Sequence, residues 1–445
     1  MGGGRFQVCS SSQTPSELEA LECHFTWVKE FTRSELLHMK VKLEDIGTDE
    51  GNFWLGSIYN MWGFVLYKLD SSEEALQFLN KATETLKRLR EEDEGPWLVV
   101  NYGNLAWLHH HLGEEAKCQD YLSKVGALKS KFPSPSQDEL HPEIYAEKAW
   151  TLMKFDKEKK QLAADYFQRA FNMQPDVVQW QSSRVIALAS AAKHWYTDLS
   201  DDLLQEIRTA REQDPENLYV AAVELRLRKR KGETVEDEAE TLGQKILLQP
   251  VNSYSGLKPL LRLHRQQGSL DEAIVLTEEA LQRHPNERYL KRCAALCYKW
   301  KVLGFWGDQA DQRTIERAIQ LLKEVINLYP DTSFPKKVDL ADVQAKSCQD
   351  HAKADQMYQD LLKMENLDSG DKQLLYYSYA RYLYFKCQDS NKSIRYHMMA
   401  AEIQPRDFYG KLSVKELKKI CERGRNGMCT EIREFLENLP DDDSD

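Results

Sequence analysis

The stretch from Leu257 to Pro285 reads LKPLLRLHRQQGSLDEAIVLTEEALQRHP, and its pattern decides the fold. Apolar residues recur three and four positions apart on both sides of Gly268, which is the period of two amphipathic helices. Gly268 supplies the permissive backbone that a helix end requires, and Pro285 stops the second helix. Ser269 and Glu272 have the spacing of a capping box. The stretch therefore predicts a helix, a tight turn and a second helix.

Small residues mark the places where these two helices must approach closely, at Ala273 and Ala280. With this pattern the segment resembles a tetratricopeptide repeat, a helix-turn-helix unit of about 34 residues. Comparable units recur along the chain, and most of them end at a proline. These prolines are Pro175, Pro215, Pro250, Pro285, Pro330 and Pro405. About nine such units can bury a continuous stacked core that one hairpin could not bury alone.

The predicted fold class is all-α, a tetratricopeptide-repeat superhelix of about nine units with extra N-terminal and C-terminal helices. Thr14 and Pro15 are expected to open a single helix that runs through Phe31. The predicted organisation has five parts: a disordered N-terminus (1–14), a helical lead-in (15–50), the superhelix with its central groove (51–412), C-terminal capping helices (413–439, the pair starting near Val414) and an acidic tail (440–445).

Composition limits the function. Lysine and arginine total 60 against 71 aspartate and glutamate, a net charge of −11, so the chain cannot bind nucleic acid with its whole surface. DNA and membranes are therefore not expected partners, and any polyanion must bind in a local basic pocket. No segment has the length or apolar character of a membrane span or a signal peptide. The nine scattered cysteines are typical of free thiols in a reducing compartment, so the predicted location is the cytoplasm.

Three cations share one face of the first helix of the quoted stretch. Lys258, Arg262 and Arg265 lie at i, i+4 and i+7. Like charges at this spacing repel each other unless an anion or an acidic neighbour compensates them. Two interpretations follow, a solvated helix face or a groove site for a polyanion or acidic peptide.

Other first helices place cations and aromatic rings at corresponding positions. Trp150 and Lys154 are i, i+4 neighbours, Tyr219 lies at the start of a later unit, and Arg292 and Lys299 follow one unit after Lys258. Cations combined with stacking aromatics are what single-stranded nucleic acid requires. For Trp150 the alternative is ordinary core packing.

Catalysis has no support in the sequence. No phosphate-binding glycine loop, nucleophile elbow or zinc-protease motif is present. His109, His110 and His111 are consecutive on a predicted helix, so their side chains diverge and cannot all hold one ion. We expect no catalytic residues, no metal and no cofactor.

Four short runs carry a closer resemblance. Leu21–Trp27 (LECHFTW), Asn104–Trp107, His141–Ile144 and Leu296–Lys299 are similar to runs in the interferon-induced proteins with tetratricopeptide repeats. The resemblance covers nearly the whole chain. It implies a cytoplasmic, non-enzymatic antiviral effector that holds the 5′ end of single-stranded viral RNA in a basic internal tunnel. Within that family some members recognise a 5′-triphosphate, some a cap lacking 2′-O-methylation, and others act as scaffolds.

The resemblance also assigns roles to particular residues. It places a cap-facing or base-facing ring at Trp150, a phosphate lysine at Lys154 and a groove tyrosine at Tyr219. Two RNA-contacting arginine positions fall on Lys258 and Arg265, and a family histidine position is Arg292. An arginine that serves the 5′ phosphates corresponds to Ser190, with Lys193 close by in the sequence.

Two functions follow from these patterns. The first is an interferon-induced innate-immune effector that binds the 5′ end of single-stranded non-self RNA, bearing a triphosphate or an incompletely methylated cap. The alternative is a tetratricopeptide scaffold in innate immune signalling with little RNA binding, whose partners would be related repeat proteins or translation factors. The net acidity and the serine at position 190 favour the alternative, and the inward cations favour the first.

Overall fold

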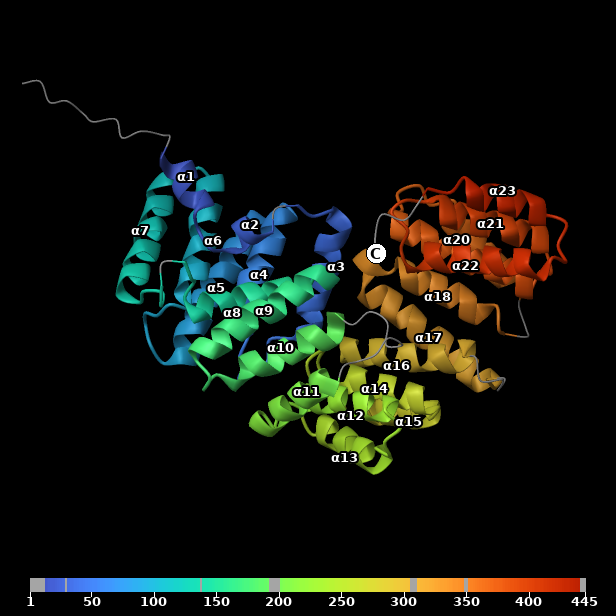
Figure 1. Ribbon diagram of the computed structural model, residues 1–445, viewed down its shortest axis with the longest axis horizontal. Helices are drawn as coiled ribbons and strands as arrows, with labels where there is room; N and C mark the ends of the chain where they lie inside the picture. Colours follow the sequence, from blue (N-terminus) through green and yellow to red (C-terminus); the bar gives the residue numbers. More distant parts are fainter. Residues whose placement is uncertain are drawn as a thin grey trace, which may run out of the picture. The chain divides into compact units, whose positions relative to one another are not determined.

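The computed structural model of the protein describes residues 13–28, 30–136, 138–191, 201–304, 310–347 and 351–440 (Figure 1). Within these ranges the chain is helical, and the described residues contain no strand. The chain forms two compact units, residues 1–263 and residues 264–445. Residues 1–12 of the predicted disordered N-terminus, the tail 441–445 and Lys193 lie outside the described residues.

The described helices follow one another along the chain in pairs. The pairs are α4 (Leu55–Lys68) with α5 (Ser72–Arg90), α6 (Leu98–His111) with α7 (Glu115–Lys131), α8 (Pro142–Leu152) with α9 (Lys157–Met173), α10 (Val178–Ala191) with α11 (Asp201–Gln213), α12 (Leu218–Arg230) with α13 (Glu236–Leu247), α14 (Leu257–Gln267) with α15 (Leu270–Arg283), α16 (Arg288–Leu303) with α17 (Gln312–Leu328), α18 (Phe334–Gln344) with α19 (His351–Leu362), and α20 (Ser369–Phe385) with α21 (Ser390–Glu402). Over the described residues this makes nine pairs, so the predicted all-α tetratricopeptide fold is confirmed.

Additional helices flank the repeats. The helices α1 (Gln13–Glu19), α2 (His24–Trp27) and α3 (Arg33–Ile46) precede them, α22 (Phe408–Arg423) and α23 (Cys429–Glu437) follow them, and a 3-10 turn spans Pro330–Thr332. The C-terminal pair begins at Phe408, six residues before the predicted start at Val414, because Asp407 caps the helix by accepting from the backbone N–H groups of Tyr409 and Gly410.

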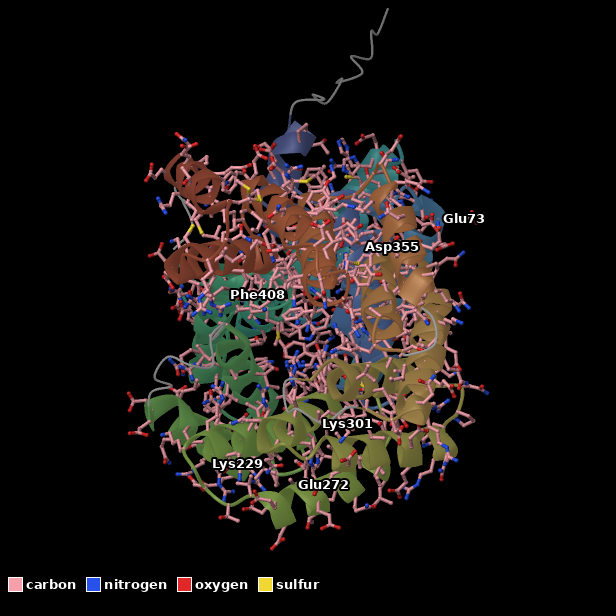
Figure 2. The ribbon with its side chains drawn as sticks, turned by 90° about the vertical axis from the view of Figure 1, so that its right-hand side faces the viewer. Glu73, Lys229, Glu272, Lys301, Asp355 and Phe408 are labelled. Atoms are coloured by element: carbon pink, nitrogen blue, oxygen red, sulfur yellow. The ribbon has the colours of Figure 1, made fainter. Side chains whose placement is uncertain are left out.

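Consecutive helices pack against each other within each unit. In the first unit α4 packs on α5, α6 on α7, α8 on α9 and α9 on α10; in the second α16 packs on α17, α20 on α21 and α21 on α22. Charged side chains such as Glu73 on α5 and Glu272 on α15 point to solvent (Figure 2). None of the helices in the described ranges combines the length and apolar character needed to cross a bilayer.

The predicted capping box at the start of α15 is not formed. Ser269 Oγ donates to the carbonyl of His264 at 3.3 Å, and the Glu272 carboxylate lies 3.2 Å from His264 Nδ1. Both side chains therefore close the preceding helix instead of opening the next one. Gly268 adopts a φ of +83°, as the helix-end assignment requires.

The lead-in is also different from the prediction, because the single helix through Phe31 is broken into α1 and α2. Thr26 Oγ1 donates to the carbonyls of Leu21 and Cys23, which replaces helical bonds there. His24 is fully buried; its backbone N–H donates to Asn104 Oδ1, and its Nε2 lies 3.0 Å from Thr151 Oγ1. The Cys23–Trp27 run therefore connects the lead-in to helices α6 and α8 through hydrogen bonds of His24.

Close packing of α4 on α5 depends on Gly63. A Cβ atom at this position would lie 2.7 Å from Leu79 Cγ and 3.0 Å from the Ala75 carbonyl oxygen. We expect Gly63→Ala to lower the free energy of unfolding by about 1–3 kcal/mol, because backbone and core must shift. The matched control is Gly126→Ala on α7, where a Cβ meets nothing within 4 Å, and where alanine should stabilise the helix by up to about 1 kcal/mol. Urea unfolding measures both, and equal effects would contradict the packing argument.

Burial of His24 makes stability depend on pH. Burial lowers the pKa of His24 from 6.5 to about 3, so between these values the unfolded chain binds a proton that the folded chain excludes. Stability must therefore fall as the pH drops below 6.5. His24→Gln keeps hydrogen-bonding capacity but does not titrate. Between pH 7 and pH 5 we therefore expect its free energy of unfolding to fall by about 2 kcal/mol less than that of the parent protein. Denaturant unfolding at both pH values tests this expectation, and parallel losses in the two proteins would disprove it.

Candidate functional site

A cavity of about 550 Å³ opens in the first unit, a size suited to a small ligand. It is lined by α3, the residues just before α4, the end of α8 and the turn after it, the first turn of α9, helix α10, the start of α12, the segment 249–255 and the start of α14. Four lysines line it, Lys42, Lys154, Lys160 and Lys258, whereas Glu216 is the one carboxylate among its described lining residues. The wall is therefore cationic although the chain carries a net charge of −11.

Lys154 has the most confined ammonium group of this wall. Its Nζ lies 4.0 Å from the centroid of the Trp150 ring and 5.0 Å from that of Tyr254, and it donates a short hydrogen bond to the Tyr254 hydroxyl. Burial, together with repulsion from Lys42 and Lys160, lowers the pKa of Lys154 well below its usual value. An anion placed in the cavity would favour the charged ammonium and so offset both effects.

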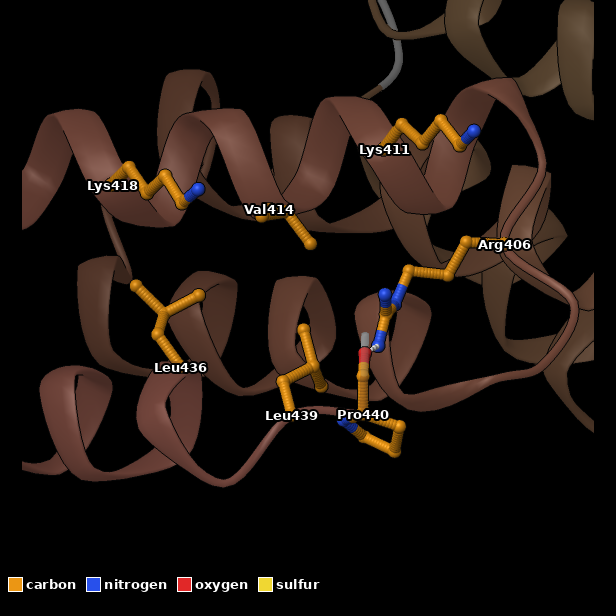
Figure 3. A pocket seen from close by; sticks show the side chains of 7 residues that line it. All are labelled: Arg406, Lys411, Val414, Lys418, Leu436, Leu439 and Pro440. Atoms are coloured by element: carbon orange, nitrogen blue, oxygen red, sulfur yellow. Dashed lines mark hydrogen bonds between the residues drawn. The ribbon is translucent and has the colours of Figure 1, made fainter. Parts of the chain in front are cut away.

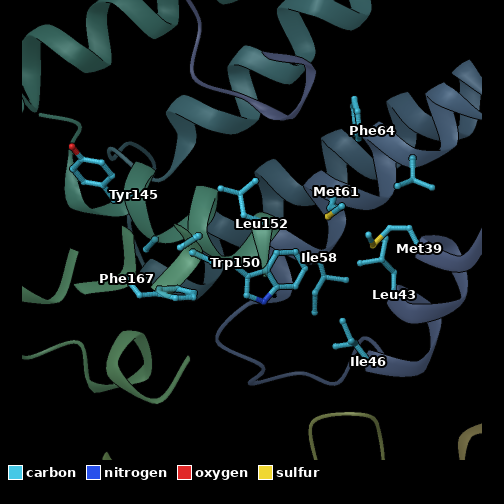
Figure 4. Packing of buried hydrophobic residues seen from close by; sticks show 14 of the residues in the cluster. Met39, Leu43, Ile46, Ile58, Met61, Phe64, Tyr145, Trp150, Leu152 and Phe167 are labelled. Atoms are coloured by element: carbon cyan, nitrogen blue, oxygen red, sulfur yellow. The ribbon is translucent and has the colours of Figure 1, made fainter. Parts of the chain in front are cut away.

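Trp150 belongs to the hydrophobic core beneath the cavity and is only 1% exposed. It packs in one cluster with side chains of α3, α4 and α9, among them Leu43, Ile58 and Phe167 (Figure 4). Trp54, at the N-terminal end of α4, lies with its ring 6.0 Å from that of Trp150 and inclined by 25°. The core-packing alternative for Trp150 thus describes its surroundings, while the same ring forms part of the cavity wall.

The segment before α14 brings Tyr254 into the cavity. The side chain of Asn252 accepts from the backbone N–H of Tyr254 at 2.8 Å and donates to Asp49 at 2.8 Å. Gly256 has a φ of +83°, and a Cβ there would lie 2.6 Å from the Leu218 carbonyl oxygen. This close approach, which only glycine permits, holds the segment against the start of α12.

Tyr219 joins the cavity to a group of arginines. It is half-buried at the start of α12, and burial raises its pKa while Arg262 and Arg226 lower it. Arg226 is buried, and burial together with the charges of Arg262 and Arg230 lowers its pKa to about 10. Positive charge therefore continues along α12 and α14 beyond the cavity.

Comparison with known proteins extends over nearly the whole chain. The human antiviral innate immune response effector IFIT1 is 25% identical over 424 residues, which cover 92% of this chain and 87% of the relative. The human interferon-induced protein with tetratricopeptide repeats 2 is 26% identical over 442 residues, 95% and 92% of the two chains. No protein-family model matches the sequence. The chain is a homologue of the interferon-induced proteins with tetratricopeptide repeats.

Two solved structures of a relative have the same fold. The human IFIT1 dimer with PPP-AAAA superposes with a TM-score of 0.69 at 25% identity, covering 96% of this chain and 95% of the other. The human IFIT1 dimer with m7Gppp-AAAA superposes with a TM-score of 0.71 at 24% identity, covering 96% and 95%. The latter likeness, below a quarter identity, supports the fold alone.

Several predicted site residues of this interferon-induced-protein homologue meet in the first unit. Trp150, Lys154, Tyr219 and Lys258 all line the cavity, and so does Ser190, which stands where the resemblance expects an arginine. Ser190 Oγ donates to the Ala187 carbonyl at 2.9 Å. Arg262 is exposed on α14 and lies near Tyr219.

The remaining predicted residues are in the second unit. The guanidinium of Arg265 lies 4.8 Å from the Trp300 ring centroid, and that of Arg292 lies 5.3 Å from the Tyr329 ring centroid. Lys299 forms an ion pair with Asp339, a buried carboxylate that Lys336 also contacts at 2.7 Å. The charge of Lys299 is therefore compensated within the protein, which weakens its assignment to a polyanion site.

Sequence reasoning missed part of the cavity wall. Lys42 lies on α3, for which the sequence predicts only a lead-in helix. It follows the buried Met39 by three positions, and its Nζ donates to the Lys154 carbonyl at 3.0 Å. Tyr254 lies in a connection without helical period, where only Asn252 and Gly256 signal an ordered turn. Lys160 lies in the first turn of α9 and offers no pattern of its own.

A smaller cavity of about 300 Å³ lies in the second unit between α22, the end of α23 and Pro440 (Figure 3). Lys411 and Lys418 line it, together with the apolar side chains of Val414, Leu436 and Leu439. Arg406, also in its wall, donates to the carbonyls of Ala401 and Pro440. The guanidinium of this arginine is used in these contacts to the backbone, so we do not assign it to ligand binding.

Replacing Lys154 by an uncharged residue should make the protein more stable. Because burial and like charges disfavour its ammonium, we expect Lys154→Met to raise the free energy of unfolding by about 1 kcal/mol, or Tm by roughly 2–4 °C. The folded-state pKa lies below the unfolded value, so the gain should be largest at low pH and shrink as the pH rises toward 10.5. Thermal melts at several pH values measure it. The control is Lys245→Met, because Lys245 is exposed on α13 and its replacement should change Tm little. A lower Tm for Lys154→Met would contradict the argument.

Proposed function

We propose that this protein is an interferon-induced antiviral effector that binds the 5′ end of single-stranded non-self RNA in the cavity of the first unit. It acts without catalysis, and its place of action is the cytoplasm. The proposal rests on one observation, a confined lysine wall on an acidic chain. The similarity to human IFIT1, whose structure with PPP-AAAA is 25% identical to this chain, supports the same class of ligand.

The chemistry of a 5′ end suits this wall. A terminal phosphate group carries more negative charge than an internal phosphodiester, and lysines act as point charges toward phosphate. Lys154 lines the cavity beside Trp150 and Tyr254, with Lys42, Lys160 and Lys258 as further cations around the same cavity. Tyr219 and Arg262 then offer a ring and a charge to the nucleotides that follow.

The fold also supports a second candidate, a protein-interaction scaffold for related repeat proteins or translation factors. Pairing of Lys299 with Asp339 favours it, because this pairing removes one predicted cation from the set available to RNA. The binding experiment separates the two candidates, since a scaffold has no reason to respond to a 5′ phosphate.

The test compares single-stranded RNA of one sequence with a 5′-triphosphate or a 5′-hydroxyl, by fluorescence anisotropy at several salt concentrations. We expect the triphosphate RNA to bind more tightly, with a slope of log K against log salt of roughly −2 to −3 from four lysine–phosphate contacts. Lys154→Met should weaken this binding at least about tenfold, because it removes the confined charge.

Lys245→Met is the control, since Lys245 is an exposed lysine of α13 outside the cavity. It should bind as the parent protein does. Equal affinities for the triphosphate and hydroxyl RNAs, or affinities independent of salt, would overturn the proposed function in favour of the scaffold.

A further inference from the structure

We propose that His110, Glu115 and Cys118 form a binding site for a divalent transition-metal ion, and that Zn²⁺ is the ion that suits these three side chains. The site lies at the turn between α6 and α7. None of the three residues lines the cavity assigned to RNA, so the proposal is independent of the proposed function.

The three side chains meet because the chain reverses direction within a short turn. His110 lies in the last turn of α6, and Glu115 and Cys118 lie three positions apart in the first turn of α7. One ligand atom of each residue lies within 4.8 Å of those of the other two, and His110 Nδ1 is 3.1 Å from a carboxylate oxygen of Glu115. Within the described residues, no other three histidine, cysteine or acidic side chains are brought together in this way.

Neighbouring contacts select which of the three consecutive histidines takes part. His109 Nδ1 lies 2.5 Å from a carboxylate oxygen of Glu114, and the His111 ring stacks on an aromatic ring of α4 with centroids 5.1 Å apart. His110 instead lies beside Glu115. Consecutive histidines cannot share one ion, but this site needs only His110 of the three, so the expectation of no metal does not extend to it.

Cys118 supplies the ligand that distinguishes this group from an ordinary surface ion pair. Its side chain has no exposed surface, and no hydrogen bond of its thiol is found within the described residues. Glu115 and, from α1, Glu17 are close enough for their negative charges to act on Cys118. A divalent cation would be attracted by both carboxylates and would take the place of the thiol proton.

The combination of a thiolate, an imidazole and a carboxylate identifies the class of ion. Zn²⁺ binds all three in tetrahedral sites at about 2.0–2.3 Å, whereas Mg²⁺ and Ca²⁺ prefer oxygen ligands. Such bonds place the ligand atoms roughly 3.3–3.8 Å apart, so the side chains must move inward by about 1 Å. The side chains of His110 and Glu115 are 30% and 59% exposed, which leaves room for this movement. On binding, the thiol of Cys118 releases its proton to solvent, and the neutral imidazole releases none.

A bound ion would stabilise the end of the α6–α7 pair and the helix α1 that packs on it (Figure 1). Gln119, next to Cys118, donates from Nε2 to Thr14 Oγ1 at 3.1 Å. Trp107 Nε1 donates to the Leu18 carbonyl at 3.1 Å. The ion would lie beside these contacts between α1 and the pair, so we assign it a structural role.

The experiment titrates the full, metal-free chain with Co²⁺ and then with Zn²⁺, in a reducing buffer that does not chelate metals. Co²⁺ bound to a thiolate absorbs in the near ultraviolet, and we expect this band to grow until about one ion is bound per chain. Zn²⁺ should displace Co²⁺, because it favours tetrahedral sites with thiolate ligands, and it should raise Tm. If no thiolate–cobalt band appears, the proposal is wrong.

Three variants locate the ion. We expect Cys118→Ser to abolish the cobalt band and to weaken Zn²⁺ binding at least about a hundredfold, since losing even a residue that supports a ligand costs about 10–100-fold. His110→Gln changes a partly exposed side chain and should weaken Zn²⁺ binding at least about tenfold. Cys387→Ser replaces an exposed thiol outside the group and should bind both ions as the parent protein does.

Thermal melts without metal establish that each variant is folded, and His110→Gln decides the outcome if Cys118→Ser is not. A cobalt band that persists in Cys118→Ser, or that is lost in Cys387→Ser, would place the ion at other cysteines and overturn the proposal. Unchanged Zn²⁺ affinity in His110→Gln would overturn it as well.

Discussion

The ammonium group of Lys154 is the constraint on which the site depends. It lies against the ring of Trp150 and donates to the Tyr254 hydroxyl, and the neighbouring charges that shift its pKa are those of Lys42 and Lys160. A charge so confined is unfavourable unless polar neighbours or an anion stabilise it. The cation–π contact and the phenol provide partial compensation. On the proposed function, a bound anion would supply the rest of the compensation.

The fold maintains this arrangement through the core below it. Trp150 is fixed by the side chains of α3, α4 and α9, so the base of the cavity cannot collapse onto the lysine. The segment carrying Tyr254 is tied on two sides, by Asn252 to Asp49 and by the close approach of Gly256 to Leu218. A lead-in helix, a repeat helix and an irregular connection thus converge on one group. Each is anchored by contacts that do not involve the ligand.

The sequence predicted those features that depend on the helical period of its apolar residues and on the prolines and glycines that end helices. Prolines such as Pro250 and Pro285 end repeats, and the i, i+4 pair Trp150–Lys154 does line one cavity. It could not predict features that depend on three-dimensional partners. Thr26 breaks the lead-in by bonding to local carbonyls, and Asp339, forty residues away, compensates Lys299. Tyr254 lies where no helical pattern exists, so nothing in the sequence linked it with Lys154.

The contrast between an acidic chain and a basic cavity has a consequence for selectivity. The net negative charge of the protein repels a polyanion, but at physiological salt this repulsion is largely screened beyond a Debye length of about 8 Å. Attraction inside a partly buried cavity is screened much less. Internal stretches of RNA present only single charges to the outer surface and gain little there. On the proposed function, a 5′ end brings several charges together at the cavity, so the same charge distribution that weakens general binding would favour recognition of the terminus.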